Sequence, residues 1–193
     1  MHPHGQPVTT AARAPIGESR GFTFPGKPAL FLDRDGVINE RIQDGYVLEL
    51  EQLKILEPFL ATFGGISTAW AGPIVIVSNQ ACVGKNLLDE RGLRAIMRAT
   101  VAALREEDIH IAAWYCCPHA PEEGCECRKP RPGLFVRGVA ELGVRIDRSC
   151  FIGDLESDAQ AGAAAGCSTY IVDAADQASF QAARAFADTV LRR

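Results

Sequence analysis

The sequence lacks the features that a membrane or secreted protein needs. None of its apolar runs is long enough to span a bilayer. The opening residues, MHPHGQPVTTAARAPIGESRG, contain no apolar core of a secretory signal. They are rich in Pro, Gly, Thr and Ala and show no periodicity, so we predict a disordered leader over residues 1–26, followed by one domain over 27–193. These absences favour a cytoplasmic protein with no membrane partner.

An excess of positive charge is also missing. The chain has 20 Lys and Arg residues against 24 Asp and Glu residues, a net charge of -4. A basic field that would recruit nucleic acid is therefore absent, and we expect no nucleic-acid partner. With 47% hydrophobic residues among 193, the chain can bury a sizeable core. We expect one globular domain that acts as a monomer.

Short apolar runs alternate with longer amphipathic segments along the chain. This alternation is typical of the α/β class, here a Rossmann-like parallel sheet flanked by helices. The runs predict strands over residues 29–32, 73–77, 109–115, 150–152 and 169–172. The amphipathic segments predict helices over 59–70, 89–107, 132–143, 157–165 and 178–191. The first of these helices is weakened by Gly64 and Gly65.

Polar residues follow several of these strands, at the sheet edge where open α/β sheets bind ligands. Asp33 and Asp35 come directly after the first strand and, in an extended chain, point to the same face. One carboxylate can attack phosphorus and the other can transfer protons. The alternative is an ordinary acidic turn, DRDG, because Asp and Gly are common turn residues.

Other strand ends add candidates for the same site. Asp154 and Asp158 can complete an oxygen-rich magnesium site, although acids are also common at helix N-termini. Ser78, helped by the backbone amides of Asn79 and Gln80, can bind a phosphoryl oxygen or can simply cap a turn. Lys129 can offset phosphate charge or be a solvated surface lysine.

In this order, the motifs FLDRDGVIN, VSNQ, RKP and FIGDLESD resemble those of the haloacid dehalogenase-like phosphatase superfamily. The resemblance implies that Asp33 is the nucleophile, which becomes an aspartyl-phosphate, and that Asp35 is the general acid/base. It implies phosphate binding by Ser78, Asn79, Arg128 and Lys129. It also implies a magnesium ion held by Asp33, the backbone carbonyl of Asp35 and Asp154, with Asp158 in support.

Four of the seven cysteines cluster in one turn-rich segment, the cysteine loop (residues 116–129). Three thiolates and one imidazole suit tetrahedral zinc, and a disulfide is the alternative. The predicted zinc ligands are Cys117, His119, Cys125 and Cys127. We expect Cys116 to face inward at the end of a strand. The isolated Cys82, Cys150 and Cys167 are predicted to be small buried hydrophobic residues.

The pattern CPHxP…CxCRKP resembles a subgroup that contains D-glycero-D-manno-heptose 1,7-bisphosphate phosphatases and histidinol-phosphate phosphatase domains. The resemblance implies that zinc is structural and fixes the loop that delivers Arg128 and Lys129. RKPRPGLF and the segment DGYV (44–47) are more similar to the heptose enzymes. The expected substrate is thus a small phosphorylated sugar, a heptose 1,7-bisphosphate that loses its 7-phosphate, with histidinol phosphate or another sugar phosphate as the alternative.

The sequence departs from these relatives at two places, and one other function competes with the predicted one. Leu155 stands where such relatives usually carry a basic residue, and ILEPFLATFGG lacks their Pro-Gly helix opening. The spacing between motifs leaves no room for a separate cap domain. A zinc-ribbon interaction module is the competing function, and the acidic net charge disfavours it.

Overall fold

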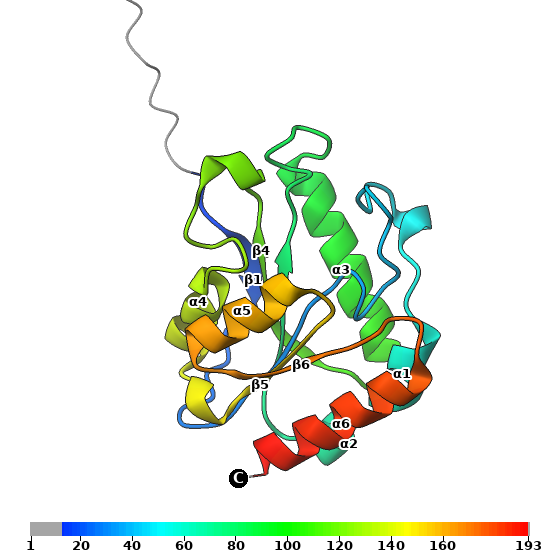
Figure 1. The fold of residues 1–193 in the computed structure, drawn as a ribbon, viewed down its shortest axis with the longest axis vertical. Helices are drawn as coiled ribbons and strands as arrows, with labels where there is room; N and C mark the ends of the chain where they lie inside the picture. The colour runs from blue at the N-terminus through cyan, green and yellow to red at the C-terminus, as the bar shows by residue number, and fades with distance from the viewer. Residues whose placement is uncertain (1–12, 193) are drawn as a thin grey trace, which may run out of the picture.

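The computed structural model describes residues 13–192, which form a sheet of six strands with helices on both faces (Figure 1). The strand order is β1-β4-β3-β2-β5-β6. Strands β2 to β6 run parallel, and β1 pairs antiparallel with β4. Their bounds are Ile16–Ser19 (β1), Leu30–Leu32 (β2), Ile74–Asn79 (β3), Ile111–Cys117 (β4), Cys150–Gly153 (β5) and Ser168–Ile171 (β6). The predicted parallel sheet is confirmed.

Within the described residues, six α-helices pack around the sheet. They are Glu57–Phe63 (α1), Ile66–Ala69 (α2), Glu90–Glu106 (α3), Gly133–Leu142 (α4), Glu156–Ala165 (α5) and Gln177–Leu191 (α6). The helix predicted over 59–70 is divided in two, because Gly64 ends α1 and Gly65 adopts a positive φ of 71° before α2. No helix within residues 13–192 is both long and apolar enough to cross a membrane.

The core consists of two layers, because successive residues of a strand point to opposite faces of the sheet. On β3, Ile74 and Ile76 pack into the layer that contains α1, α3 and α6. Val75 and Val77 pack into the layer that contains α4 and α5. The central strands are therefore apolar along most of their length, as is typical of a parallel sheet buried on both sides.

Strand β1 lies inside the segment predicted to be a leader. Ile16 pairs with Cys116 across the β1–β4 ladder and is only 3% exposed. Side chains also hold this strand: Arg94 of α3 donates to the carbonyl of Gly17 (3.2 Å), and Arg137 of α4 donates to the carbonyl of Pro15 (2.6 Å). The domain therefore begins before residue 27. Residues 1–12, the rest of the predicted leader, lie outside the described part of the chain.

Candidate active site

Asp33 and Asp35 follow β2, at the edge of the sheet where β3, β4 and β5 also end. The amide of Asp33 donates to the carbonyl of Ile152 on β5 (2.9 Å), which continues the parallel ladder past the end of β2. Gly36 then turns the chain with a φ of 92°, and a Cβ atom there would lie 2.0 Å from Oδ2 of Asp154. Only glycine permits both this conformation and this close approach.

Lys129 is held at the centre of the site. Its side chain is almost fully buried, and its Nζ lies 2.9 Å from Oδ1 of Asp33 and 2.8 Å from Oδ1 of Asp158. Nζ also donates to the carbonyl of Val77 on β3 (3.1 Å). The side chain of Asn79 accepts from the amide of Lys129 and donates to its carbonyl, each at 3.1 Å. The sheet thus fixes both the backbone and the ammonium group of this lysine.

Asn79 and Asp158 have more specific contacts than the sequence predicted. The backbone amide of Asn79 was expected near phosphate, and in addition both polar atoms of its side chain bind the backbone of Lys129. Asp158 was expected near magnesium, and its Oδ2 accepts hydrogen bonds from the amides of Asp154 and Leu155, both at 3.1 Å. Asp158 therefore joins the start of α5 to Lys129.

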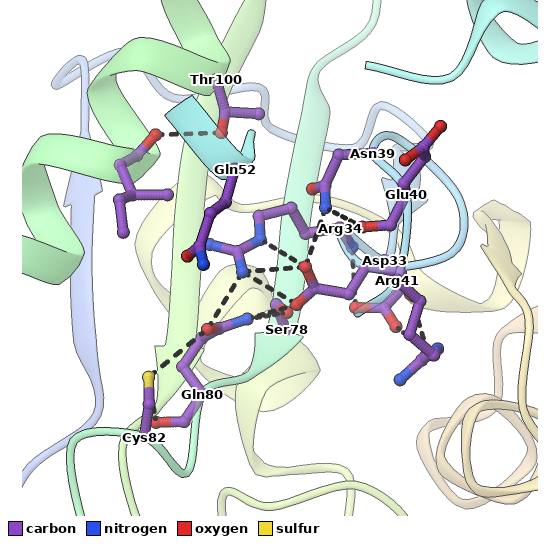
Figure 2. Close-up of polar contacts among 12 residues, drawn as sticks. Asp33, Arg34, Asn39, Glu40, Arg41, Gln52, Ser78, Gln80, Cys82 and Thr100 are labelled. Atoms are coloured by element: carbon purple, nitrogen blue, oxygen red, sulfur yellow. Dashed lines mark hydrogen bonds and ion pairs between the residues drawn. The ribbon is translucent and has the colours of Figure 1, made fainter. Parts of the chain in front are cut away.

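Asp35 is anchored by a buried arginine that the sequence analysis did not single out. Arg34 has no exposed side-chain surface, and its Nη2 lies 2.8 Å and 2.9 Å from the two carboxylate oxygens of Asp35. Gln80 donates to Oδ2 of Asp35 (2.7 Å) and to Ser78 (2.9 Å), and it accepts from Arg34 (3.1 Å). Figure 2 shows Arg34, Gln80 and Ser78 directed toward one another in this network.

These contacts set the charge of Asp35. Burial would raise its pKa. The positive charge of Arg34 and hydrogen bonds from Asn39, Arg34 and Gln80 lower it. The pKa of Asp35 consequently lies below its ordinary value. The carboxylate form is thus favoured at neutral pH.

Asp33 shows the opposite shift. Burial raises its pKa to about 7, the charge of Lys129 opposes this rise, and the neighbouring carboxylates of Asp158, Asp154 and Asp35 add to it. Close negative charges that keep a carboxyl group partly protonated indicate a site that is short of positive charge. Such a site would take up an additional cation.

The oxygen atoms at this edge fit a hard divalent cation. Carboxylate oxygens of Asp33, Asp154 and Asp158 lie within 4.8 Å of one another. The carbonyl of Asp35 lies beside them, since one Nη2 atom of Arg41 contacts both that carbonyl and Asp154 at 2.7 Å. Magnesium prefers carboxylate and carbonyl oxygens. The residues present therefore suit the magnesium ion that the sequence resemblance implies.

A pocket of about 570 Å³ opens above these residues. Its floor contains Asp33, Asp35, Ser78 and Lys129. The basic residues that line it further are Arg41, Lys85 and Arg128. The acidic Asp44 and the apolar Leu155 also line it. The structure thus brings all the predicted phosphate-binding residues to one cavity. It adds the side chain of Arg41 at the cavity and the buried side chains of Arg34 and Gln80 beside it. The arginine between two aspartates in DRDG was the sequence signal for Arg34.

The cysteine loop places its four candidate ligands around one point. Sγ of Cys117 lies 3.5 Å from Nδ1 of His119 and 3.5 Å from Sγ of Cys125. Sγ of Cys127 lies 3.2 Å from the same nitrogen and 3.5 Å from Cys125. Zinc bonds of about 2.0–2.3 Å in a tetrahedron require ligand separations in this range. The set therefore fits a zinc ion, and all seven cysteines are free of disulfides.

Contacts within the loop connect this cluster to the pocket. The hydrogen bond between the thiols of Cys127 and Cys117 lowers the pKa of Cys117 to about 5. The same hydrogen bond raises the pKa of Cys127. Arg128 follows directly and reaches the carbonyl of His119 at 3.5 Å. Cys116 is fully buried at the end of β4, as predicted, and Cys82, Cys150 and Cys167 are buried as well.

Comparisons with known proteins agree with this geometry. The HAD-hydrolase-like family model matches residues 126–190. A D-glycero-beta-D-manno-heptose-1,7-bisphosphate 7-phosphatase of Photorhabdus laumondii is 30% identical over 154 residues, 76% of this chain and 80% of the relative. A D-glycero-alpha-D-manno-heptose-1,7-bisphosphate 7-phosphatase of Burkholderia mallei is 34% identical over 151 residues, 75% of this chain and 78% of the relative.

A solved structure shows the same fold. The D,D-heptose 1,7-bisphosphate phosphatase from B. bronchiseptica, complexed with magnesium and phosphate, is 32% identical. It has a TM-score of 0.70 and covers 75% of this chain and 80% of its own. The strand-end carboxylates, the buried lysine and these similarities lead to one conclusion. The chain belongs to the haloacid dehalogenase-like phosphatases, in the family that includes the heptose 1,7-bisphosphate 7-phosphatases.

Proposed function

We propose that this protein is a magnesium-dependent phosphatase that removes the 7-phosphate of D-glycero-D-manno-heptose 1,7-bisphosphate. The observation that carries the proposal is the contact of Lys129 with Asp33 and Asp158 on the floor of a pocket lined by further cations. A nucleophilic carboxylate beside a fixed ammonium group matches the needs of phosphoryl transfer. One named relative acts on the beta anomer and the other on the alpha anomer. Membership of the family therefore does not tell which anomer this protein prefers.

In the first step, a carboxylate oxygen of Asp33 attacks phosphorus, and the bond from phosphorus to the sugar oxygen breaks. Asp35 has to be protonated for this step and donates its proton to the departing oxygen. The step leaves an aspartyl-phosphate on Asp33 and a carboxylate on Asp35. Lys129 and Ser78 hold the phosphoryl oxygens. A bound magnesium ion would neutralise charge on the nucleophile and the phosphoryl group.

In the second step, water attacks the aspartyl-phosphate, and Asp35 takes the proton. Arg34 and Gln80 keep Asp35 ionised and fix its orientation, so that a carboxylate is available to take this proton. Phosphate then leaves, and the carboxylate of Asp33 is restored. Asp158 and Asn79 act as positioning residues, since each binds Lys129.

We assign zinc a structural role in this proposal. The cysteine loop ends at Arg128 and Lys129, and Cys127 is adjacent to Arg128. A zinc ion at Cys117, His119, Cys125 and Cys127 would fix the loop that carries both cations. Preorganisation of this kind matters, because a misplacement of about 1 Å can cost roughly a hundredfold in rate.

The test is phosphate release with and without magnesium. The substrates are both anomers of heptose 1,7-bisphosphate, histidinol phosphate and common sugar phosphates. We expect the highest kcat/KM for one heptose anomer and a requirement for magnesium. Preference for histidinol phosphate would retain the mechanism and reject the substrate.

Two variants test whether the protein is an enzyme or an interaction module. D33N should abolish turnover, while D147N, an equivalent change in an exposed ion pair with Arg145, should retain it. If D33N retained the wild-type rate, the nucleophile assignment would be rejected. If the wild-type chain released no phosphate from any substrate, the enzymatic proposal itself would fail.

A further inference from the structure

Arg41 occupies an unexpected position in the site. Its Nη2 lies 2.7 Å from the backbone carbonyl of Asp35 and 2.7 Å and 2.8 Å from the two carboxylate oxygens of Asp154. Its Nε adds a hydrogen bond of 3.0 Å to Oδ2 of Asp154. Oδ2 of Asp33 lies 4.0 Å from the same Nη2. Figure 2 shows Arg41 directed toward Asp33.

These oxygens are the ones proposed above to hold magnesium. A magnesium ion needs its ligands at about 2.0–2.1 Å. A nitrogen that lies 2.7 Å from both the carbonyl of Asp35 and a carboxylate oxygen of Asp154 fills the space between them. The ion and the guanidinium group therefore exclude each other, both by volume and by charge.

Arg41 differs from the other cations of the site in how firmly it is held. Its side chain is 37% exposed, whereas the side chains of Arg34 and Lys129 are 0% and 2% exposed. It lies in a segment without regular secondary structure between residues 40 and 49, and its neighbours Ile42 and Gln43 line the pocket. The guanidinium can move into solvent without unpacking the core.

We propose that Arg41 is a placeholder cation, a positioning residue that holds Asp154 and the carbonyl of Asp35 until magnesium displaces it. In the metal-free protein the guanidinium reduces repulsion among Asp33, Asp154 and Asp158. Magnesium binding replaces the Arg41–Asp154 ion pair with metal–oxygen contacts and releases the side chain. This inference rests on the magnesium site of the proposed function, but it requires no particular sugar substrate.

The proposal predicts a gain of metal affinity when the arginine is removed. In the wild-type chain, magnesium has to break the Arg41–Asp154 pair, whereas in R41M it meets uncompensated carboxylates. We expect R41M to bind magnesium about three- to tenfold more tightly in isothermal titration calorimetry without substrate. A residue that only maintained the structure of the site would give the opposite result, because its loss would weaken binding.

Stability provides a second readout. In magnesium-free buffer R41M should unfold at a lower temperature than the wild type, and the difference should shrink at saturating magnesium. K85M is the matched control, because Lys85 lies at the same pocket but contacts the ring of Tyr46 rather than the carboxylates. Its magnesium affinity should stay within about twofold of the wild type.

The result that overturns the proposal is equal or weaker magnesium binding by R41M, or no magnesium binding by either chain. A wild-type chain that binds magnesium with the predicted R41M effect, yet hydrolyses no heptose bisphosphate, would support this inference and reject the proposed substrate. The two proposals can therefore fail separately.

Discussion

Arg34 is the residue whose burial most directly controls the chemistry of the site. It forms three hydrogen bonds with Asp35, one hydrogen bond with Gln80 and a 3.7 Å contact with the sulfur of Met97. Removing one partner of a buried ion pair leaves an uncompensated charge in the core. The lowered pKa of Asp35 therefore depends on this arginine.

R34K should retain the charge but lose the bidentate geometry. We expect a loss of about 1–3 kcal/mol in the free energy of unfolding. The pKa of Asp35 should rise, so the acidic limb of the pH–rate profile should move to higher pH. R145K, an equivalent change in the exposed pair with Asp147, should leave both quantities unchanged. An unshifted acidic limb in R34K would show that Arg34 does not set the charge of Asp35.

Asp33 should make stability depend on pH in magnesium-free buffer. Its pKa is about 7 in the folded protein, against about 4 for an exposed aspartate. The folded state therefore binds this proton more tightly than the unfolded state. Its contribution to stability is fully present below about pH 4, decreases as the pH rises to about 7 and is constant above that value.

Urea unfolding of the wild type and D33N between pH 5 and pH 8 checks this prediction. The free energy of unfolding of the wild type relative to D33N should fall as the pH rises toward 7. Saturating magnesium should reduce this decrease, because a bound cation favours the ionised carboxylate. A difference that is independent of pH in magnesium-free buffer would contradict the raised pKa of Asp33.

Among the elements, the cysteine loop joins the two candidate metal sites. Its cluster lies at the end of β4, and the loop leads to Lys129 under the pocket. Since the loop contains only a short 3-10 helix over Pro121–Glu123, hydrogen bonds of regular structure contribute little to its rigidity. A bound metal would supply the missing constraint.

C125S should therefore lose most of its zinc, measured by elemental analysis, and should unfold at a lower temperature. Its rate of phosphate release should fall by up to about a hundredfold, since Arg128 and Lys129 lose their support. C167A is the control, because Cys167 directly precedes β6, at the far edge of the sheet from β1, and is not among the four candidate zinc ligands. Full zinc content in C125S would reject the assigned ligand set.

At the scale of the whole molecule, β1 completes the sheet beyond β4. It covers an edge on which Cys116 and Trp114 are 0% and 3% exposed. A chain that starts at residue 27 should lose this cover, whereas a chain that starts at residue 13 should keep it. We expect the shorter chain to be less stable by about 2 kcal/mol or more and to aggregate more readily. Equal urea midpoints for the two chains would contradict this role of β1.

Local pattern explains why most elements could be predicted. The apolar run 73–77 and the helical spacing of Leu93, Ile96 and Met97 correspond to β3 and α3. Strand β1 was missed because IGES has no clear alternation and its partners lie about 100 residues away. The division of α1 from α2 depended on the φ of Gly65, for which the pair of glycines was only a weak signal.

The sequence by itself determined which chemical groups end the strands: the carboxylates of DRDG, the serine of VSNQ, the lysine of RKP and the thiols of the cysteine loop. Periodicity predicts where the strands lie along the chain, and parallel strands bring such ends to one edge of the sheet. Only the tertiary structure decided which groups pair. Ion pairs such as Lys129–Asp33 and Arg41–Asp154 depend on burial and on distances of a few ångström. Those distances arise from packing between segments remote in the chain, and no local pattern specifies them.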